Sequence, residues 1–197
     1  METITESQLK NFVIACQRIA GNGLVCCSSG NLSWRVDNKH MLVSSTRTWL
    51  GRITIDQVAI CRIDDGVALN EVVPTSEIHF HTGILKKRSD VNIVLHFQTP
   101  FATALACRKK DKPINYAVIS EISFYIGKIA EVPYLPPGSM ELADAVTNAA
   151  TNCDLVMMRN HGQVVVGKTF DEVIQNARFF ELACSIIVRM GNNVKPI

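Results

Sequence analysis

The 197-residue sequence lacks the features that mark several classes of protein. No stretch reaches about 18 uninterrupted apolar residues, so a membrane-spanning helix is not expected. Lys and Arg number 20 against 18 Asp and Glu, and there is no basic run, which argues against a nucleic-acid partner. The segment Met1–Glu6 has no apolar core of a secretory signal. We expect a soluble, cytoplasmic protein that binds neither membrane nor nucleic acid.

The cysteines do not form a pattern of metal ligands or disulfides. There are seven, an odd number, and none stand in a CxxC pair. We therefore expect small buried hydrophobes or idle thiols, and we expect the adjacent pair Cys26 and Cys27 to serve packing rather than redox chemistry. Repeats, linkers and low-complexity segments are absent as well, and 47% of the residues are hydrophobic. Residues 1–197 are predicted to form one domain.

Periodicity and capping signals predict alternating helices and strands. Helices are expected after Thr5, Pro74, Pro100, Ser139 and Thr169, where hydroxyls or proline precede apolar residues at helical spacing. Strands are expected at 31–36, 40–44, 58–63, 92–98, 155–159 and 163–167. The segment 113–126 mixes both signals and receives no assignment.

The apolar strand at 92–98 delivers His96 and then Gln98, whose side chains point to the same face because strand side chains alternate. Two imidazoles at that spacing would clamp a metal ion, but here the second donor is an amide. A second histidine, His161, lies at a turn between two apolar strands, where Gly162 would let the backbone turn tightly.

Three hydroxyl-rich segments accompany these histidines, at 28–33, 45–51 and 74–77. The first exposes backbone N–H groups that suit an anion, although an ordinary tight turn explains it too. The second contains Arg47, which can hold phosphate bidentately. The third opens a helix and places Glu77 and His81 on one face. The helix dipole alone would favour Glu77 there, and His81 could be a hydrogen-bonded core residue.

Four blocks, in this order and spacing, carry a family resemblance. They are Ser29-Gly30-Asn31-Leu32-Ser33, Pro74-Thr75-Ser76-Glu77 with His81, Val94-Leu95-His96 through Ala106, and Asn160-His161-Gly162 with Val165 to Thr169. With them the chain resembles the class II aldolase/adducin family, the fuculose-phosphate aldolase group in particular. The resemblance implies an α/β fold of three layers, with a central, largely antiparallel mixed sheet between helices. It also implies a homotetramer with sites at subunit interfaces.

The resemblance further implies a zinc ion that is held by three histidines and polarises a sugar phosphate. It also implies a glutamate that moves the proton. His96 and His161 match the first and third ligands, and Glu77 matches the acid/base. Phosphate-binding positions are matched by Gly30, Asn31, Thr46, Thr75 and Ser76. Two positions depart from the pattern: Gln98 replaces the second histidine ligand, and Arg47 stands where the phosphate loop usually has glycine. An amide oxygen favours harder metals, so another divalent ion could replace zinc.

The predicted function is a metal-dependent aldolase that cleaves a ketose or deoxyketose 1-phosphate into dihydroxyacetone phosphate and an aldehyde. Two alternatives stay open. One is an epimerase or dehydratase acting on a sugar phosphate, and the other is a non-catalytic, adducin-like binding module whose metal site has degraded, as the loss of one histidine would allow. The sequence does not identify a second acid group or the aldehyde half of the substrate.

Overall fold

One seven-stranded sheet passes through the protein in the order β3-β2-β1-β4-β7-β6-β5. The computed structural model describes residues 4–109 and 113–197, so the first three residues of the polar N-terminal segment lie outside it. The strands are β1 (Asn31–Arg35), β2 (His40–Ser44), β3 (Val58–Arg62), β4 (Ile93–Phe97), β5 (Ile129–Val132), β6 (Leu155–Met158) and β7 (Gly162–Gly167). Every neighbouring pair is antiparallel except β5 and β6. The prediction of a largely antiparallel mixed sheet is confirmed.

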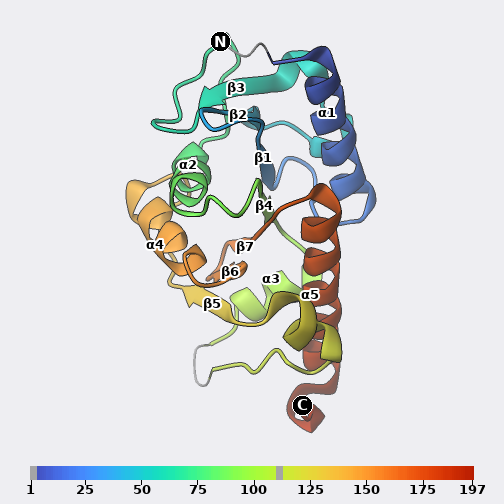
Figure 1. The fold of residues 1–197 in the computed structure, drawn as a ribbon. Helices are drawn as coiled ribbons and strands as arrows, with labels where there is room; N and C mark the ends of the chain where they lie inside the picture. Colours follow the sequence, from blue (N-terminus) through green and yellow to red (C-terminus); the bar gives the residue numbers. More distant parts are fainter. Residues whose placement is uncertain (1–3, 110–112) are drawn as a thin grey trace.

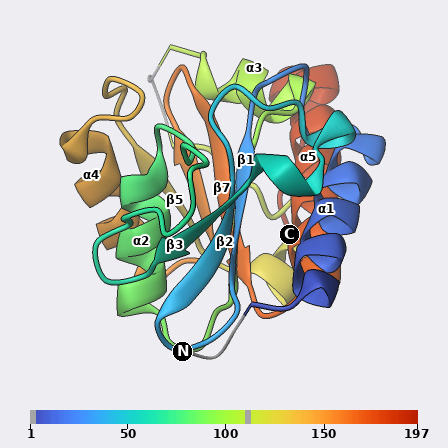
Figure 2. The same cartoon turned by 90° about the horizontal axis from the view of Figure 1, so that it is seen from above.

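Helices cover both faces of this sheet (Figures 1 and 2). On one face lie α1 (Glu6–Gly21), α3 (Pro100–Ala106) and α5 (Phe170–Met190), and on the other lie α2 (Ile78–Lys87) and α4 (Met140–Ala150). Shorter turns are η1 (Leu50–Arg52), η2 (Ile55–Gln57), the π-helical η3 (Ile122–Ile126) and η4 (Gly191–Asn193). The three-layer prediction is therefore confirmed. Among the described helices, none is both long and apolar enough to cross a bilayer.

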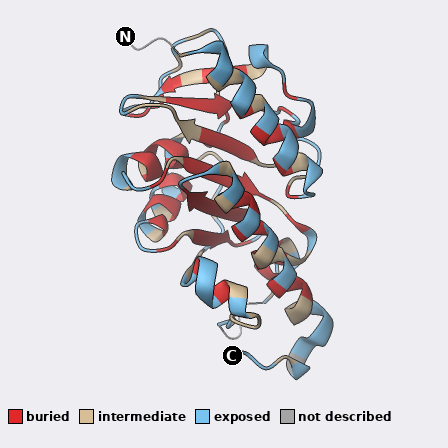
Figure 3. Ribbon diagram, turned by 45° about the vertical axis from the view of Figure 1, so that its right-hand side comes forward, coloured by how far each residue is buried: buried red, intermediate tan, exposed pale blue. Residues whose placement is uncertain are grey.

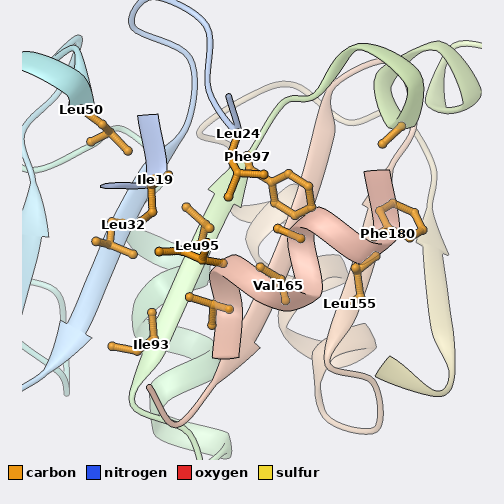
Figure 4. Close-up of a cluster of buried hydrophobic side chains, with 14 of the residues drawn as sticks. Ile19, Leu24, Leu32, Leu50, Ile93, Leu95, Phe97, Leu155, Val165 and Phe180 are labelled. Atoms are coloured by element: carbon orange, nitrogen blue, oxygen red, sulfur yellow. The ribbon is translucent and has the colours of Figure 1, made fainter. Parts of the chain in front are cut away.

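The sheet is buried on both faces, so its central strands are red along their length in Figure 3. In β4, Leu95 and Phe97 pack into the cluster beneath α1 and α5, which Figure 4 shows in close-up. Val94 belongs to the cluster beneath α2 and α4. Because side chains alternate along a strand, His96 points to the same face as Val94, toward α2.

Local signals fix where the helices begin. Thr5 and Gln8 form a capping box at α1, and the side chains of Ser139 and Thr169 accept backbone N–H groups at the starts of α4 and α5. These three predicted starts are confirmed. The sequence did not predict β5, because this strand depends on parallel pairing with β6, a contact between segments distant in the chain.

Close packing of α2 on α4 depends on Gly83. A Cβ at this position would lie 3.1 Å from Cγ2 and 3.2 Å from Cβ of Thr147, and both distances are shorter than normal contacts. We predict that Gly83→Ala lowers the free energy of unfolding by about 1–3 kcal/mol, as measured by urea denaturation, because the two helices must separate. Gly21→Ala is the control. It has open space around it, so the substitution should leave stability unchanged or raise it by up to about 1 kcal/mol. Equal effects at the two positions would contradict this account.

Candidate functional site

A pocket of about 330 Å³ lies where the ends of β1, β2 and β4 meet the start of α2 and the β6–β7 turn. All ten residues that the sequence nominated for the site line it: Gly30, Asn31, Thr46, Arg47, Thr75, Ser76, Glu77, His96, Gln98 and His161. Four further residues line it that the sequence did not nominate, namely Ser28, Ser29, Ser45 and Pro137. The three serines belong to the hydroxyl-rich segments, and that composition was the available signal.

The sheet register brings the first residues together. In the β1–β4 pair, Asn31 lies directly opposite His96. The residue before it, Gly30, has φ +82, and a Cβ there would be 2.7 Å from the carbonyl oxygen of His96. Only glycine satisfies both the backbone conformation and the space. The turn that precedes β1 is thereby held against the end of β4.

Glu77, His96 and His161 form a cluster whose ligand atoms all lie within 4.8 Å of one another. His96 Nε2 is 3.6 Å from Glu77 Oε2, and His161 Nε2 is 3.4 Å from Glu77 Oε1. The side chains of Glu77 and His96 are 5% and 2% exposed. One strand, one helix start and one hairpin turn therefore converge on a single buried point.

This cluster fits a divalent metal ion. Ligands about 2.1 Å from a tetrahedral ion are separated by about 3.4 Å. The distances from the Glu77 oxygens to the two imidazoles are close to this value. His96 Nδ1 donates to the carbonyl of Gln163 at 2.9 Å, which leaves the lone pair of Nε2 free. Glu77 Oε1 is buried and has no hydrogen-bond partner among the described residues. Burial and the neighbouring His96 lower the pKa of His161, and these effects outweigh the opposing effect of Glu77. The lowered pKa favours the neutral imidazole, which is the form that binds metal.

A buried hydrogen-bond chain orients Glu77. Asn31 Nδ2 donates to Glu77 Oε2 at 3.0 Å, and Asn31 Oδ1 accepts from His81 Nε2 at 2.6 Å. His81 Nδ1 then accepts from the hydroxyl of Ser33 at 2.7 Å. Burial, with a smaller effect of His96, lowers the pKa of His81 to about 3, so this imidazole stays neutral. His81 is thus the hydrogen-bonded core residue that the sequence allowed, and Ser33 joins it because it lies two residues after Asn31 on the same face of β1.

The side-chain amide of Gln98 contacts the backbone of the β6–β7 turn, which carries His161. Its Nε2 donates to the carbonyl oxygen of His161 at 2.8 Å, and its backbone N–H donates to the carbonyl of Leu24 at 3.0 Å. A carbonyl oxygen only accepts, so the nitrogen of the amide must face it and Oε1 points elsewhere. Gln98 therefore lines the pocket while it fixes the position of His161.

The predicted reason for Gly162 was wrong. Its φ is not positive, and the left-handed residue of this turn is Asn160, with φ 52. Glycine is needed at 162 for space, because a Cβ there would lie 2.7 Å from Gln98 Cγ and 2.8 Å from His96 Cε1. The missing side chain lets the β6–β7 turn approach β4 closely.

The remaining wall of the pocket carries hydroxyls and one cation. Thr75 donates its backbone N–H to Ser44, and Thr46 donates its own to Val73, so the second and third hydroxyl segments lie side by side. Arg47 adopts φ 57, a conformation that is unfavourable for a residue with a Cβ. The departure from glycine at this position therefore keeps a glycine-like backbone and adds a positive charge to the wall.

Comparisons with known proteins identify the family of the chain. The family model of the class II aldolase and adducin N-terminal domain matches residues 10–188. A 3-oxo-tetronate 4-phosphate decarboxylase of Haemophilus influenzae is 30% identical over 162 residues, 81% of this chain and 76% of that protein. An L-fuculose phosphate aldolase of Methanococcus maripaludis strain C7 is 30% identical over 173 residues, 88% of this chain and 92% of that protein.

Among solved structures, YgbL of Klebsiella pneumoniae superposes with a TM-score of 0.87 at 25% identity. The match covers 96% of this chain and 93% of YgbL, whose description gives aldolase, epimerase and decarboxylase as alternatives. An L-fuculose 1-phosphate aldolase structure at 21% identity has the same fold, with a TM-score of 0.85 and coverage of 98% and 91%. The chain belongs to the class II aldolase and adducin family.

Proposed function

We propose that the protein is a metal-dependent lyase that cleaves a ketose or deoxyketose 1-phosphate into dihydroxyacetone phosphate and an aldehyde. The observation that carries the proposal is the cluster of buried Glu77 and His96 with half-buried His161, which faces a pocket walled by hydroxyls and Arg47. A metal centre beside an anion-binding wall suits a phosphorylated substrate whose reacting carbonyl lies a few atoms from its phosphate.

Glu77, His96 and His161 would hold the ion, either zinc or another divalent metal. When bound, the metal supplies Lewis-acid chemistry: it polarises the substrate carbonyl and stabilises the negative charge left when the carbon–carbon bond breaks. Glu77 would also move the substrate proton, since it is the one carboxylate among the residues that line the described pocket. The chain from Ser33 through His81 and Asn31 keeps this carboxylate in one orientation.

The hydroxyl-rich segments of the pocket would bind the phosphate. Thr46, Arg47 and Ser76 are exposed at the pocket, and Gly30 and Thr75 present backbone and hydroxyl groups beside them. Asn31 gives one N–H of its amide to Glu77 and retains a second for the ligand. Arg47 supplies a charge that pairs with phosphate oxygens at this end of the pocket.

Decarboxylation of a phosphorylated 3-oxo acid is the second candidate. The relative from Haemophilus influenzae is named for that reaction. Both reactions leave negative charge on the carbon next to a carbonyl, but an aldol cleavage must also remove a hydroxyl proton, whereas departing carbon dioxide carries none. No tyrosine and no carboxylate besides Glu77 line the described pocket, and this scarcity of acid/base groups favours the second candidate.

The two candidates are separated by assaying the protein, purified without chelator or histidine tag, on ketose 1-phosphates and on 3-oxo-tetronate 4-phosphate. Aldehyde release together with dihydroxyacetone phosphate supports the aldolase, and carbon dioxide release supports the decarboxylase. Both candidates would be rejected by a preparation that holds under about 0.1 equivalent of divalent metal and gains no activity when zinc, manganese or cobalt is added. A binding module would then remain.

Glu77→Gln tests the proton step. We predict that exchange of the dihydroxyacetone phosphate hydrogens with deuterated water, followed by NMR, falls by about 100-fold or more because the amide accepts no proton. Because Glu77 is also proposed to hold the ion, exchange is measured with divalent metal added to saturation, and bound metal is quantified in both proteins. The matched control is Glu141→Gln, an exposed glutamate in α4, which should exchange at the wild-type rate. Retained exchange in the Glu77 variant would assign the base to another group.

Substitutions of Gln98 test whether its amide positions His161 or binds the metal. If it acts through His161, Gln98→Leu should leave the visible absorption bands of the cobalt-loaded protein in place and lower cobalt affinity by about tenfold. Gln98→His adds an imidazole and should raise zinc affinity by about tenfold or more. Bands that shift in the leucine variant, as expected on loss of a ligand, would show that the amide binds the metal directly.

A further inference from the structure

Cys26 and Cys27 are both exposed, and their sulfur atoms lie 3.8 Å apart. The expectation that this pair serves packing was wrong. Of the other cysteines, Cys16, Cys61, Cys153 and Cys184 are buried and Cys107 is exposed without a neighbouring cysteine in the sequence. Burial raises the pKa of Cys61 to about 12, which makes this thiol unreactive. The adjacent pair is thus set apart from the rest by exposure and by proximity.

The turn that carries these thiols also builds the pocket. The backbone N–H of Cys26 donates to Ser29 Oγ at 3.0 Å, and the Ser29 N–H donates to the Cys26 carbonyl at 2.9 Å. Ser28 and Ser29 then line the pocket. Cys27 lies between these groups with φ 54, a disfavoured conformation for a residue with a Cβ. A change in the backbone geometry of Cys26 therefore acts on Ser29 through these two hydrogen bonds.

We propose that Cys26 and Cys27 form an oxidation-sensitive dithiol, in which a hydroperoxide converts the pair to a disulfide and thereby weakens the binding of phosphorylated ligands in the pocket. The ligand part of this inference rests on the proposed function. The chemical part rests only on the two thiols and the turn that joins them to Ser28 and Ser29.

The reaction balances with the hydroperoxide as the oxidant. One thiolate attacks the O–O bond and becomes a sulfenic acid while the peroxide leaves as an alcohol, or as water when the oxidant is hydrogen peroxide. The second thiol attacks the sulfenic sulfur, the S–S bond forms, and the hydroxyl group leaves with a proton as water. Two electrons pass from the sulfurs to the peroxide. The contact with Cys26 raises the pKa of Cys27, so the two thiols do not ionise together, and the second one gives up its proton as it attacks the sulfenic sulfur.

The product must distort the turn. Adjacent Cα atoms are about 3.8 Å apart across a trans peptide, whereas disulfides usually join Cα atoms about 4.4–6.8 Å apart. The strain is taken up by the backbone at Cys26 and Cys27, where the hydrogen bonds to Ser29 begin. The same strain makes the bond easy to reduce, so the effect should be reversible by a thiol.

The test uses the full chain and two probes, hydrogen peroxide and inorganic phosphate. Peroxide should produce a mass loss of about 2 Da in the peptide that contains Cys26 and Cys27, and dithiothreitol should reverse it. Phosphate affinity, measured by calorimetry, should fall by about tenfold, the effect of losing one hydrogen bond to a charged oxygen. Cys26→Ser and Cys27→Ser should bind phosphate as the wild type does, and they should keep that affinity after peroxide because neither can form the disulfide. Cys107→Ser, the matched control, should remain sensitive.

Two results would overturn the proposal: a disulfide that leaves phosphate affinity unchanged, or oxidation that stops at sulfenic or sulfinic acid. If the reduced protein binds no phosphate, the proposed phosphate site is wrong. The effect of the disulfide on the turn is then measured by amide hydrogen exchange. Disulfide formation should speed exchange at Ser29, whose N–H bonds to the Cys26 carbonyl. Unchanged exchange there would reject the proposal independently of the function of the pocket.

Discussion

The hydrogen bond from Asn31 Nδ2 to Glu77 Oε2 joins the sheet to helix α2, and the geometry of the site depends on it. Asn31 is fixed by its register opposite His96, and Glu77 is fixed as the residue that caps α2. Without this bond neither oxygen of the buried carboxylate would accept a hydrogen bond from the described residues, an unfavourable state for a charge. The bond leaves Oε1 free to contact a cation. A single contact therefore sets the orientation of Glu77 and determines which of its oxygens can bind a metal ion.

Much of the site could be predicted because its residues carry local signals. His96 follows an apolar strand, Glu77 follows two hydroxyls at a helix start, and His161 sits in a turn between strands. These patterns are short-range; their order and spacing carry the family resemblance, and the resemblance implied the role of each residue. The direction of the Gln98 amide could not be predicted in the same way. It depends on how closely the β6–β7 turn approaches β4, which is decided by packing at Gly162.

The same distinction between local and long-range signals decides which parts of the fold could be predicted. Capping residues such as Thr5 and Ser139 bind backbone groups within the next four residues, so the sequence nearby predicts where the helix starts. Those helices begin where expected. Strand β5 carries no comparable signal, since its hydrogen bonds go to β6, more than twenty residues later in the chain. The role of Ser33 was missed for a related reason: it contributes to the site only through His81, a residue of another element.

Arg47 shows that stability and binding make opposite demands on one position. Its left-handed backbone costs about 1–2 kcal/mol relative to glycine, and its exposed side chain makes no hydrogen bond or ion pair with the described residues that would offset this. Selection for thermal stability alone would therefore favour glycine here. The proposed phosphate site supplies a reason for arginine, since an anion bound beside its guanidinium would offset this cost.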